Sequence, residues 1–480
     1  MSAIDLAELF FYTEVQLHMK RLGISVSLIL AVLILAFSVL SVFGCSYYVG
    51  DNKNTVIKGF GSIDWGVDVN GGSKIAVKAA SVDEIDAVAD VVRDRAAGFG
   101  LTDHRIVVDE EAGVLELTVP SSLDCDFSAA EVAAFLTAYG EVTLRPGGSY
   151  TTMNVDSSDS ASFITPSGTT AQSVLITSDD IKGSSWFEYT EEKVTYYYVN
   201  LDFDAEGAEK MAAYTNADTG TYYNQTVSIW LDDRMLANPT VSETIDQGAL
   251  SFSSDSMTQS KCELYSAIIS SGTLPCTVSI VSTSEAAPVA GNISDIIFIA
   301  GIVALVAIAV IMLIRYKLGA VAGLCAMLLQ FSAVLAVITR FAGEGRTFLL
   351  TIPGAAALAL SVMTTVFSFL LMGERMKSEL SRGTVLGTAI STAVEKSRMI
   401  IVDMSIVLAV VALMGLFIFG TSGLTVSIFG AYNVSGVYNF SYVLFFGAVF
   451  NLVTGYLVPQ LMLRSLQSFA KKPSMFGGAK

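Results

Sequence analysis

Residues 295–314 read DIIFIAGIVALVAIAVIMLI, and every residue after the first aspartate is apolar or glycine. A helix needs roughly 20 apolar residues to cross the hydrocarbon core of a bilayer, so this stretch predicts a membrane span. Five further stretches of the same kind lie near 24–44, 318–339, 348–372, 399–420 and 440–463. The sequence therefore predicts six transmembrane helices, with one long polar block between the first and the second.

The overall composition agrees with a multi-pass membrane protein. Hydrophobic residues make up 52% of the 480 residues and charged residues 15%, and the mean hydropathy is +0.58. The polar block 46–293 holds 36 Asp or Glu against 13 Lys or Arg, which leaves a net of +6 on the rest of a chain whose total is −17. So acidic a block is an unsuitable partner for nucleic acid.

The basic residues near the membrane predict how the chain is oriented. They gather at the N-terminus, in two alternate connections and in the tail: Lys20, Arg21, Arg315, Lys317, Arg375, Lys377, Arg382, Lys396, Arg398, Arg464, Lys471, Lys472 and Lys480. The other short connections hold only Arg340 and Arg346. The positive-inside rule then puts both termini in the cytoplasm. The predicted division is a cytoplasmic N-terminus at 1–23, a first transmembrane helix at 24–45, an extracytoplasmic domain at 46–293, a five-helix bundle at 294–464 and a cytoplasmic tail at 465–480.

Strand and helix patterns alternate twice within the polar block. The first set is a strand over Val67–Ala79 with a turn at 70–72, a helix over Ser81–Ala97, strands at Ile106–Val108 and Val114–Val119, a helix over Ser128–Gly140 and a strand at Glu141–Arg145. Strand, helix, two strands, helix, strand is the order of a ferredoxin-like split βαβ unit. Ser81 with Glu84 and Ser128 with Glu131 are spaced as capping boxes.

The second set follows a polar segment. Residues 147–185 are rich in Ser, Thr, Gly and Asp, so we predict a flexible or inserted segment there. The expected elements beyond it are a strand at Lys193–Phe203, a helix from Asp204 to Thr215, a strand at Val227–Leu231, a helix at Ser256–Ser270 and a strand at Thr277–Val281. The fold class is thus a six-helix membrane protein with a large extracytoplasmic α+β domain. A Cys262–Cys276 disulfide is possible within it.

Six short segments, in order along the chain, carry a resemblance to a known family. They are GVDVNGG at 66–72, LDFDAEGAEK at 201–210, IWLDDRMLANPT at 229–240, IISSGTLP at 268–275, RYKLG at 315–319 and LTIPG at 350–354. With the predicted topology, they resemble SecD, the accessory subunit of the Sec protein-translocation channel.

The resemblance implies half of a transporter of the resistance-nodulation-division (RND) type in the cell membrane. Such a half pairs with a SecF-like six-helix subunit, acts on unfolded preproteins at the Sec channel, and draws on the proton gradient without being a bond-making enzyme. No cofactor is expected, and the sequence has no GxxxxGK[ST], HExxH or GxSxG motif. Two alternatives are an RND-type exporter of lipids or small molecules, and a membrane-anchored ligand-binding or sensor protein.

Two groups of polar residues in the apolar stretches are candidate sites. Asp403 lies about four residues into the fifth stretch, where a carboxylate is a functional candidate, although it could instead pair with Arg398 or Lys396 at the membrane boundary. The SecD pattern has an aspartate in the fourth span, but here the corresponding polar residues are Thr364, Thr365 and Ser368. Hydroxyls can bond between helices or hold water but do not titrate near neutral pH. A proton route would then depend on Asp403 or on the partner chain.

Two further candidates flank the membrane. Glu374 and Arg375 follow the fourth span and form either a solvated helix end or a charged pair that docks a partner helix. Asp68, Gly71 and Gly72 predict a tight turn, with the glycines free to take positive φ and Asp68 bonding the amides of that turn, or else a hinge. Both histidines, His18 and His104, are isolated, so no metal site is expected.

Overall fold

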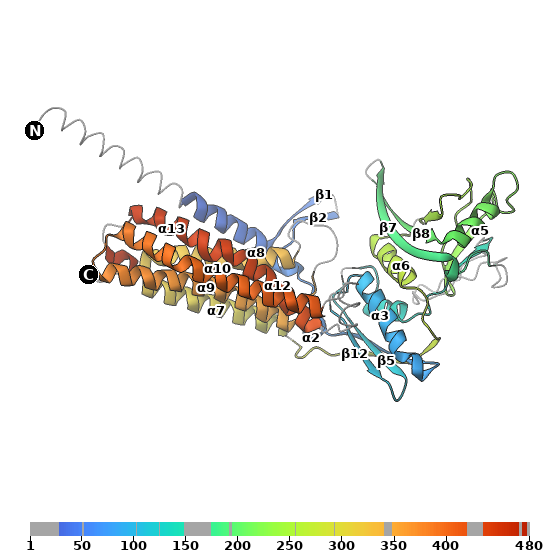
Figure 1. Cartoon of the computed structure of the whole chain (residues 1–480), viewed down its shortest axis with the longest axis horizontal. Helices are drawn as coiled ribbons and strands as arrows, with labels where there is room; N and C mark the ends of the chain where they lie inside the picture. The colour runs from blue at the N-terminus through green and yellow to red at the C-terminus, as the bar shows by residue number, and fades with distance from the viewer. Residues whose placement is uncertain are drawn as a thin grey trace, which may run out of the picture. The chain divides into compact units, whose positions relative to one another are not determined.

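The computed structural model describes residues 28–49, 52–101, 103–123, 125–147, 174–191, 194–254, 256–291, 293–339, 348–419, 435–469 and 473–477. The chain divides into two compact units, whose elements are labelled in Figure 1. The helical unit takes Met1–Asn70, Pro288–Gly420 and Asn433–Lys480, and the α+β unit takes Gly71–Ala287 with Thr421–Tyr432. The predicted N-terminal segment 1–23, Arg340 and Arg346 lie outside the described residues.

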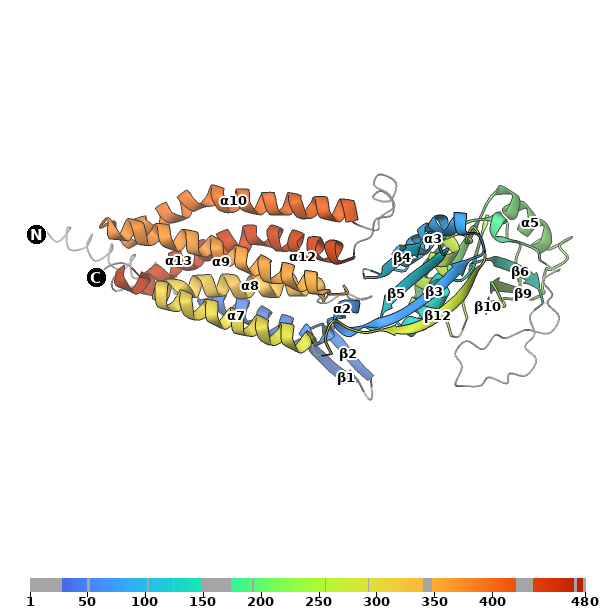
Figure 2. The same cartoon turned by 90° about the horizontal axis from the view of Figure 1, so that it is seen from below.

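Long apolar helices build the helical unit. They are the helix Leu28–Phe43, α7 (Ile293–Tyr316), α8 (Ala320–Ile338), α9 (Ile352–Ser381), α10 (Leu386–Phe419) and α12 (Ser435–Asn451), which continues through the π-helical turn η5 (Leu452–Leu457) into α13 (Val458–Leu466). Helices α7, α8, α9, α10 and α12 run side by side as a bundle (Figure 2). Four helical segments of the described chain are long and apolar enough to cross a membrane: Ile293–Ile338, Ile352–Ser381, Leu386–Phe419 and Gly436–Phe469. The predicted α-helical membrane part is therefore present.

Helices α9 and α10 extend past their apolar stretches. Thr351 caps the start of α9 by accepting from the Gly354 amide at 3.3 Å, and Pro353 lies in the first turn, where no backbone donor is needed. At its other end α9 continues through charged residues to Ser381, and α10 begins at Leu386, well before its apolar run. The charged ends of these two helices consequently pack together beyond the apolar bundle.

The α+β unit contains an antiparallel four-stranded sheet in the order β12-β3-β5-β4. Its strands are β3 (Gly72–Ala79), β4 (Arg105–Asp109), β5 (Val114–Pro120) and β12 (Val278–Ala286), and helices α3 (Ile85–Gly98), α4 (Ala129–Leu136) and α6 (Gln259–Ser271) belong to the same hydrophobic core. The apolar face of α3 is buried, because Val88, Ala89 and Val92 are all 0% exposed. Ser128 and Glu131 form the predicted capping box, whereas Ser81 makes no side-chain cap.

The predicted ferredoxin-like order is present, but its edge strand was assigned wrongly. The strand that completes the sheet beside β3 is β12, from the end of the block, whereas β6 (Val142–Pro146) pairs with β9 (Val227–Leu231) in a separate sheet that also contains β10 (Arg234–Ala237). Local sequence patterns indicate that a segment is a strand, but its pairing partner depends on contacts far along the chain. The first strand was also predicted too long, because Val67–Asn70 forms the helical turn α2.

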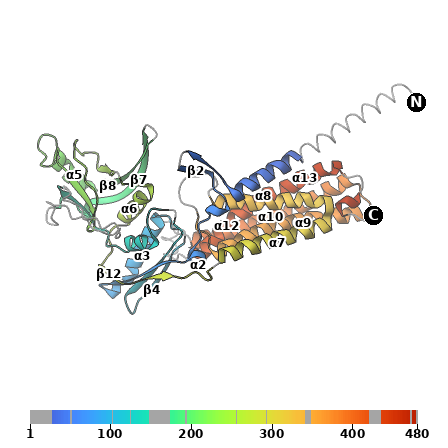
Figure 3. The same cartoon turned by 180° about the vertical axis from the view of Figure 1, so that it is seen from behind.

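A third sheet contains part of the segment predicted to be flexible. Its strands are β7 (Ile181–Glu191), β8 (Val194–Phe203) and β11 (Ala249–Phe252), with α5 (Ala205–Thr215) following β8 (Figure 3). The last part of 147–185, predicted as a flexible or inserted segment, is not flexible: Ile176 is 0% exposed and bridges to Leu144, and β7 begins at Ile181. Residues 148–173 lie outside the described part of the chain.

Two local features of the described chain complete the picture. A hairpin of β1 (Cys45–Val49) and β2 (Asn52–Ile57) follows the first helix, where no strand was predicted.

Cys262 and Cys276 are both free thiols, so the suggested disulfide is absent. Burial accordingly raises the pKa of the Cys262 thiol to about 12.

Buried His104 makes the stability of the α+β unit sensitive to pH. Burial lowers its pKa from the ordinary 6.5, with the Asp103 carboxylate opposing this effect. Below pH 6.5 the unfolded chain binds a proton that the folded chain does not, so the free energy of unfolding falls as the pH drops through 6.5 toward the lower folded value. We expect His104→Gln to flatten this dependence in urea titrations of the full chain at about pH 7.5 and about pH 5.5, followed by tryptophan fluorescence. An unchanged slope would contradict the assignment, since carboxylates titrate at lower pH.

Candidate functional site

A group of uncharged polar side chains lies buried inside the helix bundle. Its members come from α8, α9, α10 and the α12–η5 segment, and each is at most 2% exposed: Gln330, Thr365, Ser368, Ser405, Asn451 and Thr454. We call these six residues the polar network. Polar side chains in an apolar bundle are stable only when their hydrogen bonds are satisfied.

The Asn451 amide is the centre of the polar network. Its Oδ1 accepts from the Thr365 hydroxyl at 2.7 Å, and its Nδ2 donates to Ser405 Oγ at 2.9 Å and to Ser368 Oγ at 3.3 Å. Each serine donates in turn to a carbonyl of its own helix. One side chain therefore holds α12 to both α9 and α10.

Gln330 and Thr454 extend the polar network to α8. The Thr454 hydroxyl donates to Gln330 Oε1 and lies 3.2 Å from the Thr365 hydroxyl, while Gln330 Nε2 donates to the Gly447 carbonyl at 2.9 Å. The helices approach closely here, since a Cβ on Gly447 would lie 2.3 Å from Ser361 Cβ. The π-helical turn η5 begins directly after Asn451, and such turns are frequent at functional sites.

The polar network can orient helices but cannot ionise. Hydroxyl and carboxamide groups keep their protons near neutral pH, so the network can bond, shift its bonds or hold water. Two of the predicted hydroxyl residues, Thr365 and Ser368, belong to it. The third, Thr364, donates to the Ser361 carbonyl of its own helix at 2.7 Å.

Sequence reasoning missed the members outside α9. Gln330, Ser405, Asn451 and Thr454 each stand among apolar neighbours, and nothing in their spacing indicates that they meet. A signal was available for the two amides, because a carboxamide in an apolar span needs a partner.

Asp403 lies apart from the polar network. Its side chain is exposed on α10, although it is only two residues from buried Ser405. Pairing with Lys396 does not occur, because Lys396 Nζ lies 2.9 Å from Glu379 Oε1. Among the described residues no ion pair reaches Asp403, so its carboxylate faces outward from the bundle.

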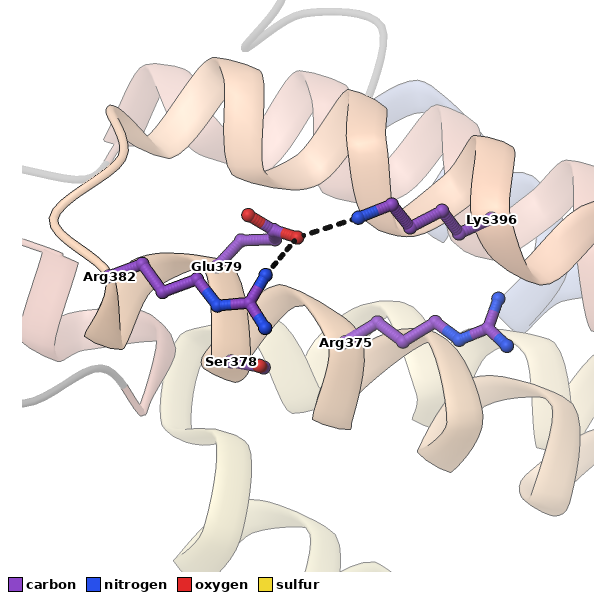
Figure 4. A pocket seen from close by; sticks show the side chains of 5 residues that line it. All are labelled: Arg375, Ser378, Glu379, Arg382 and Lys396. Carbon is purple, nitrogen blue, oxygen red and sulfur yellow. Dashed lines mark hydrogen bonds and ion pairs between the residues drawn. The ribbon is translucent and has the colours of Figure 1, made fainter.

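Glu374 and Arg375 do not act as a pair. The Glu374 carboxylate accepts from Arg315 Nε at 2.8 Å and from the Tyr316 hydroxyl at 2.6 Å, which joins α9 to α7. Arg375 instead lines a pocket between α9 and α10 (Figure 4). Successive helical residues point about 100° apart, so neighbours in sequence contact different helices. The Glu374 side chain is 47% exposed, as at a solvated helix end, and the docking of a partner helix stays a prediction.

Asp68 bonds the start of a helix that lies far along the chain. Its Oδ2 accepts from the Ile352 amide at 2.6 Å, at the start of α9, and the Leu350 amide donates to the Asp64 carbonyl at 2.8 Å. Gly71 has the predicted positive φ, at +73°. Gly72 is needed for space instead, because a Cβ would lie 2.1 Å from the Val119 carbonyl oxygen. The segment after the first helix is therefore tied to the helix that carries Thr365 and Ser368.

Known proteins resemble this chain along most of its length. A family model described as the SecDF P1 head subdomain matches residues 161–276. The protein translocase subunit SecD of Acidaminococcus fermentans is 26% identical over 306 residues, covering 63% of this chain and 67% of that protein. The chain is therefore similar to proteins of the SecD family. A SecD of Syntrophobacter fumaroxidans is 31% identical over 227 residues, covering 47% of this chain and 40% of the relative.

A solved SecDF structure supports the same fold. The crystal structure of SecDF in a super-membrane-facing form superposes with a TM-score of 0.55 at 18% identity, covering 94% of this chain and 58% of that one. The chain thus spans a little over half of a SecDF chain and between 40% and 67% of the two SecD relatives.

Proposed function

We propose that this chain is an accessory subunit of the protein-translocation machinery that assists the export of unfolded preproteins across the cell membrane. The observation that carries the proposal is the match to SecD relatives that are named protein translocase subunits, together with the SecDF-like fold. Its work in this proposal is mechanical and involves no enzymatic bond making. Its partners would be a SecF-like six-helix subunit and the Sec channel.

The proposed topology has six membrane crossings, with both termini in the cytoplasm. Support comes from Ile293–Ile338, which is interrupted at Lys317, a non-glycine residue with φ of +49°. Its two parts, α7 with 24 residues and α8 with 19, span roughly 36 and 28 Å, so each is long enough for one crossing. The helix Leu28–Phe43 would be the described part of the first crossing. The proposed boundaries are 24–45 for the first transmembrane helix, 46–293 for the extracytoplasmic domain and 294–464 for the five-helix bundle.

In the proposed mechanism the polar network transmits motion between helices. A carboxylate outside the polar network, on the surface of the bundle, binds and releases the proton. The network links four helices through bonds that can exchange partners without ionisation. Asp403 is the candidate carrier in this chain. An outward carboxylate in an apolar span is unfavourable against lipid, by roughly 2.5–3.5 kcal/mol at a helix centre and less toward an edge, so a partner helix is expected to cover it.

Asp403→Asn tests the proton assignment. We expect this variant to assemble normally and to lower preprotein export severalfold, because the carboxamide cannot release a proton. The measurement is export of a reporter preprotein into membrane vesicles with and without a proton gradient. Asp295→Asn, an exposed carboxylate in the first turn of α7, serves as the control and should export normally. Unimpaired export by the Asp403 variant would assign proton coupling to the partner alone.

Affinity purification in mild detergent tests the function as a whole. We expect a tagged chain to retain a second six-helix subunit, identified by mass spectrometry. We also expect depletion of this chain from cells to slow secretion. Recovery of a homo-oligomer with bound lipid or small molecules would favour an RND-type exporter. Function that survives removal of the last five helices would favour a membrane-anchored sensor.

A further inference from the structure

A charged pocket of about 400 Å³ lies between the end of α9 and the start of α10. It is lined by Arg375, Ser378, Glu379, Arg382 and Lys396. Figure 4 shows Glu379, near the end of α9, turned toward Lys396 of α10. Three cations against one carboxylate leave a formal charge of +2. We call these five residues the basic pocket.

The single carboxylate of the basic pocket is already shared by two cations. Glu379 Oε1 lies 2.9 Å from Lys396 Nζ and 3.3 Å from Arg382 Nη1, as the dashed lines in Figure 4 mark. The Glu379 side chain is 13% exposed, whereas those of Lys396 and Arg382 are 56% and 66% exposed. The exposed side chains of Lys396 and Arg382 can therefore turn toward a second anion, while the largely buried Glu379 carboxylate stays in the pocket.

Arg375 provides the independent observation that a ligand is needed. Its Nη1 is buried and has no hydrogen-bond partner within the described part of the chain. Figure 4 shows its guanidinium pointing away from Glu379. A buried guanidinium donor without an acceptor is strongly unfavourable, so an acceptor from outside the described residues is expected there.

The level of the basic pocket along the helices indicates what could supply that acceptor. Arg375 lies two residues after Gly373, where the apolar part of α9 ends, and Lys396 lies three residues before Met399, where the apolar part of α10 begins. Both therefore lie at the boundary between the hydrocarbon core and water, at the depth of lipid phosphates. Guanidinium and ammonium groups bind phosphate oxygens through charge-assisted hydrogen bonds.

We propose that the basic pocket binds a phosphate group, with Arg375 Nη1 as the fixed donor and Lys396 and Arg382 as mobile ones. The phosphate can come from an anionic lipid headgroup of the adjacent leaflet or from a soluble phosphate ester. Bound phosphate compensates the excess positive charge and holds the ends of α9 and α10 together. The site is separate from the polar network and does not depend on the translocation proposal.

Native mass spectrometry and thermal unfolding of the full chain in a neutral detergent test this site. The probes are phosphatidylglycerol, a glycolipid that lacks phosphate, and inorganic phosphate against chloride at equal ionic strength. We expect phosphatidylglycerol to be retained and to raise the melting temperature more than the glycolipid does. Displacement of this lipid by inorganic phosphate would identify a soluble source, and resistance to displacement would identify the lipid; both outcomes support a phosphate site.

Matched variants assign the binding to the pocket. Arg375→Gln should weaken phosphatidylglycerol binding about tenfold, as expected for loss of one charge-assisted bond, whereas Arg398→Gln, an exposed cation of α10 outside the pocket, should not. If Arg375→Gln fails to fold, Lys396→Gln replaces it, because that side chain is largely exposed. Equal retention of the phospholipid and the glycolipid, with no effect of inorganic phosphate, would overturn the proposal. So would unchanged binding by both pocket variants.

Discussion

Replacing Arg95 with methionine is expected to lower the free energy of unfolding of the α+β unit by about 3–5 kcal/mol. Arg95 is 0% exposed in the last turn of α3, yet no carboxylate among the described residues forms a salt bridge with it. Its guanidinium donates instead to the carbonyls of Leu136, Ala138, Tyr139 and Gly272 and to Ser271 Oγ. Methionine fills much of the same volume but donates nothing, so these acceptors would be left buried and unpaired.

The acceptors explain how a buried charge is stable at this position. They lie at the C-terminal ends of α4 and α6, where the helix dipoles are negative and the last carbonyls lack partners inside the helix. Burial lowers the pKa of Arg95 to about 10, with Asp232 opposing this effect, and the group stays charged at neutral pH. Arg95 thus joins two helices that are far apart in the sequence.

Arg93→Met is the matched control for this experiment. Arg93 lies two residues earlier on the same helix, where it pairs with Asp90 at the surface. Losing an exposed pair changes stability by at most about 1 kcal/mol. Urea unfolding of the full chain followed by the fluorescence of Trp186 and Trp230 compares the two variants. Equal midpoints would show that Arg95 contributes no more than a surface arginine.

Asn451→Leu is expected to destabilise the helical unit by about 2–4 kcal/mol and to impair export. The leucine keeps the size of the side chain but removes the acceptor of Thr365 and the donor to Ser368 and Ser405. Bonds of this kind between membrane helices contribute roughly 0.6–2 kcal/mol each. Because α12 would lose its directional link to α9 and α10, helix register as well as stability should suffer. Thermal unfolding in detergent and the vesicle export assay measure the two effects.

Val453→Leu is the control for Asn451. Val453 lies two residues away in η5 and is 47% exposed, so an added methylene should change neither readout. Thr454→Val removes only the edge of the polar network and should give a smaller loss than Asn451→Leu. If Asn451→Leu is as stable and as active as the unmodified chain, the polar network is a packing feature without a role in coupling.

Most secondary structure was predictable because its signals are local. In the Ser128 capping box and in the Asp204 cap, the side chain bonds an amide only three residues further along the chain, and the glycine with positive φ that ends α6, Gly272, directly follows that helix. The apolar stretches likewise predicted helices long enough for a membrane. These features depend on a few neighbouring residues, so the sequence alone indicates them.

Pairing between distant segments was not predictable in the same way. Nothing near Val142 distinguishes a strand that joins β3 from one that joins β9. Ile176 lies in a polar segment, and no neighbour in sequence indicates that it is buried against Leu144. Each choice depends on which surfaces remain uncovered after the rest of the chain has packed.

The sequence by itself determined that this is a SecD-like membrane protein with an acidic α+β domain, and that the apolar part of α9 carries hydroxyls without a titratable group. Only the tertiary structure decided which polar residues meet. Asn451 and Thr365 are 86 residues apart and come within 2.7 Å, whereas adjacent Glu374 and Arg375 contact different helices. Helical geometry separates neighbours around the axis, and packing brings distant faces together, so a site shared by several helices exists only in the folded chain.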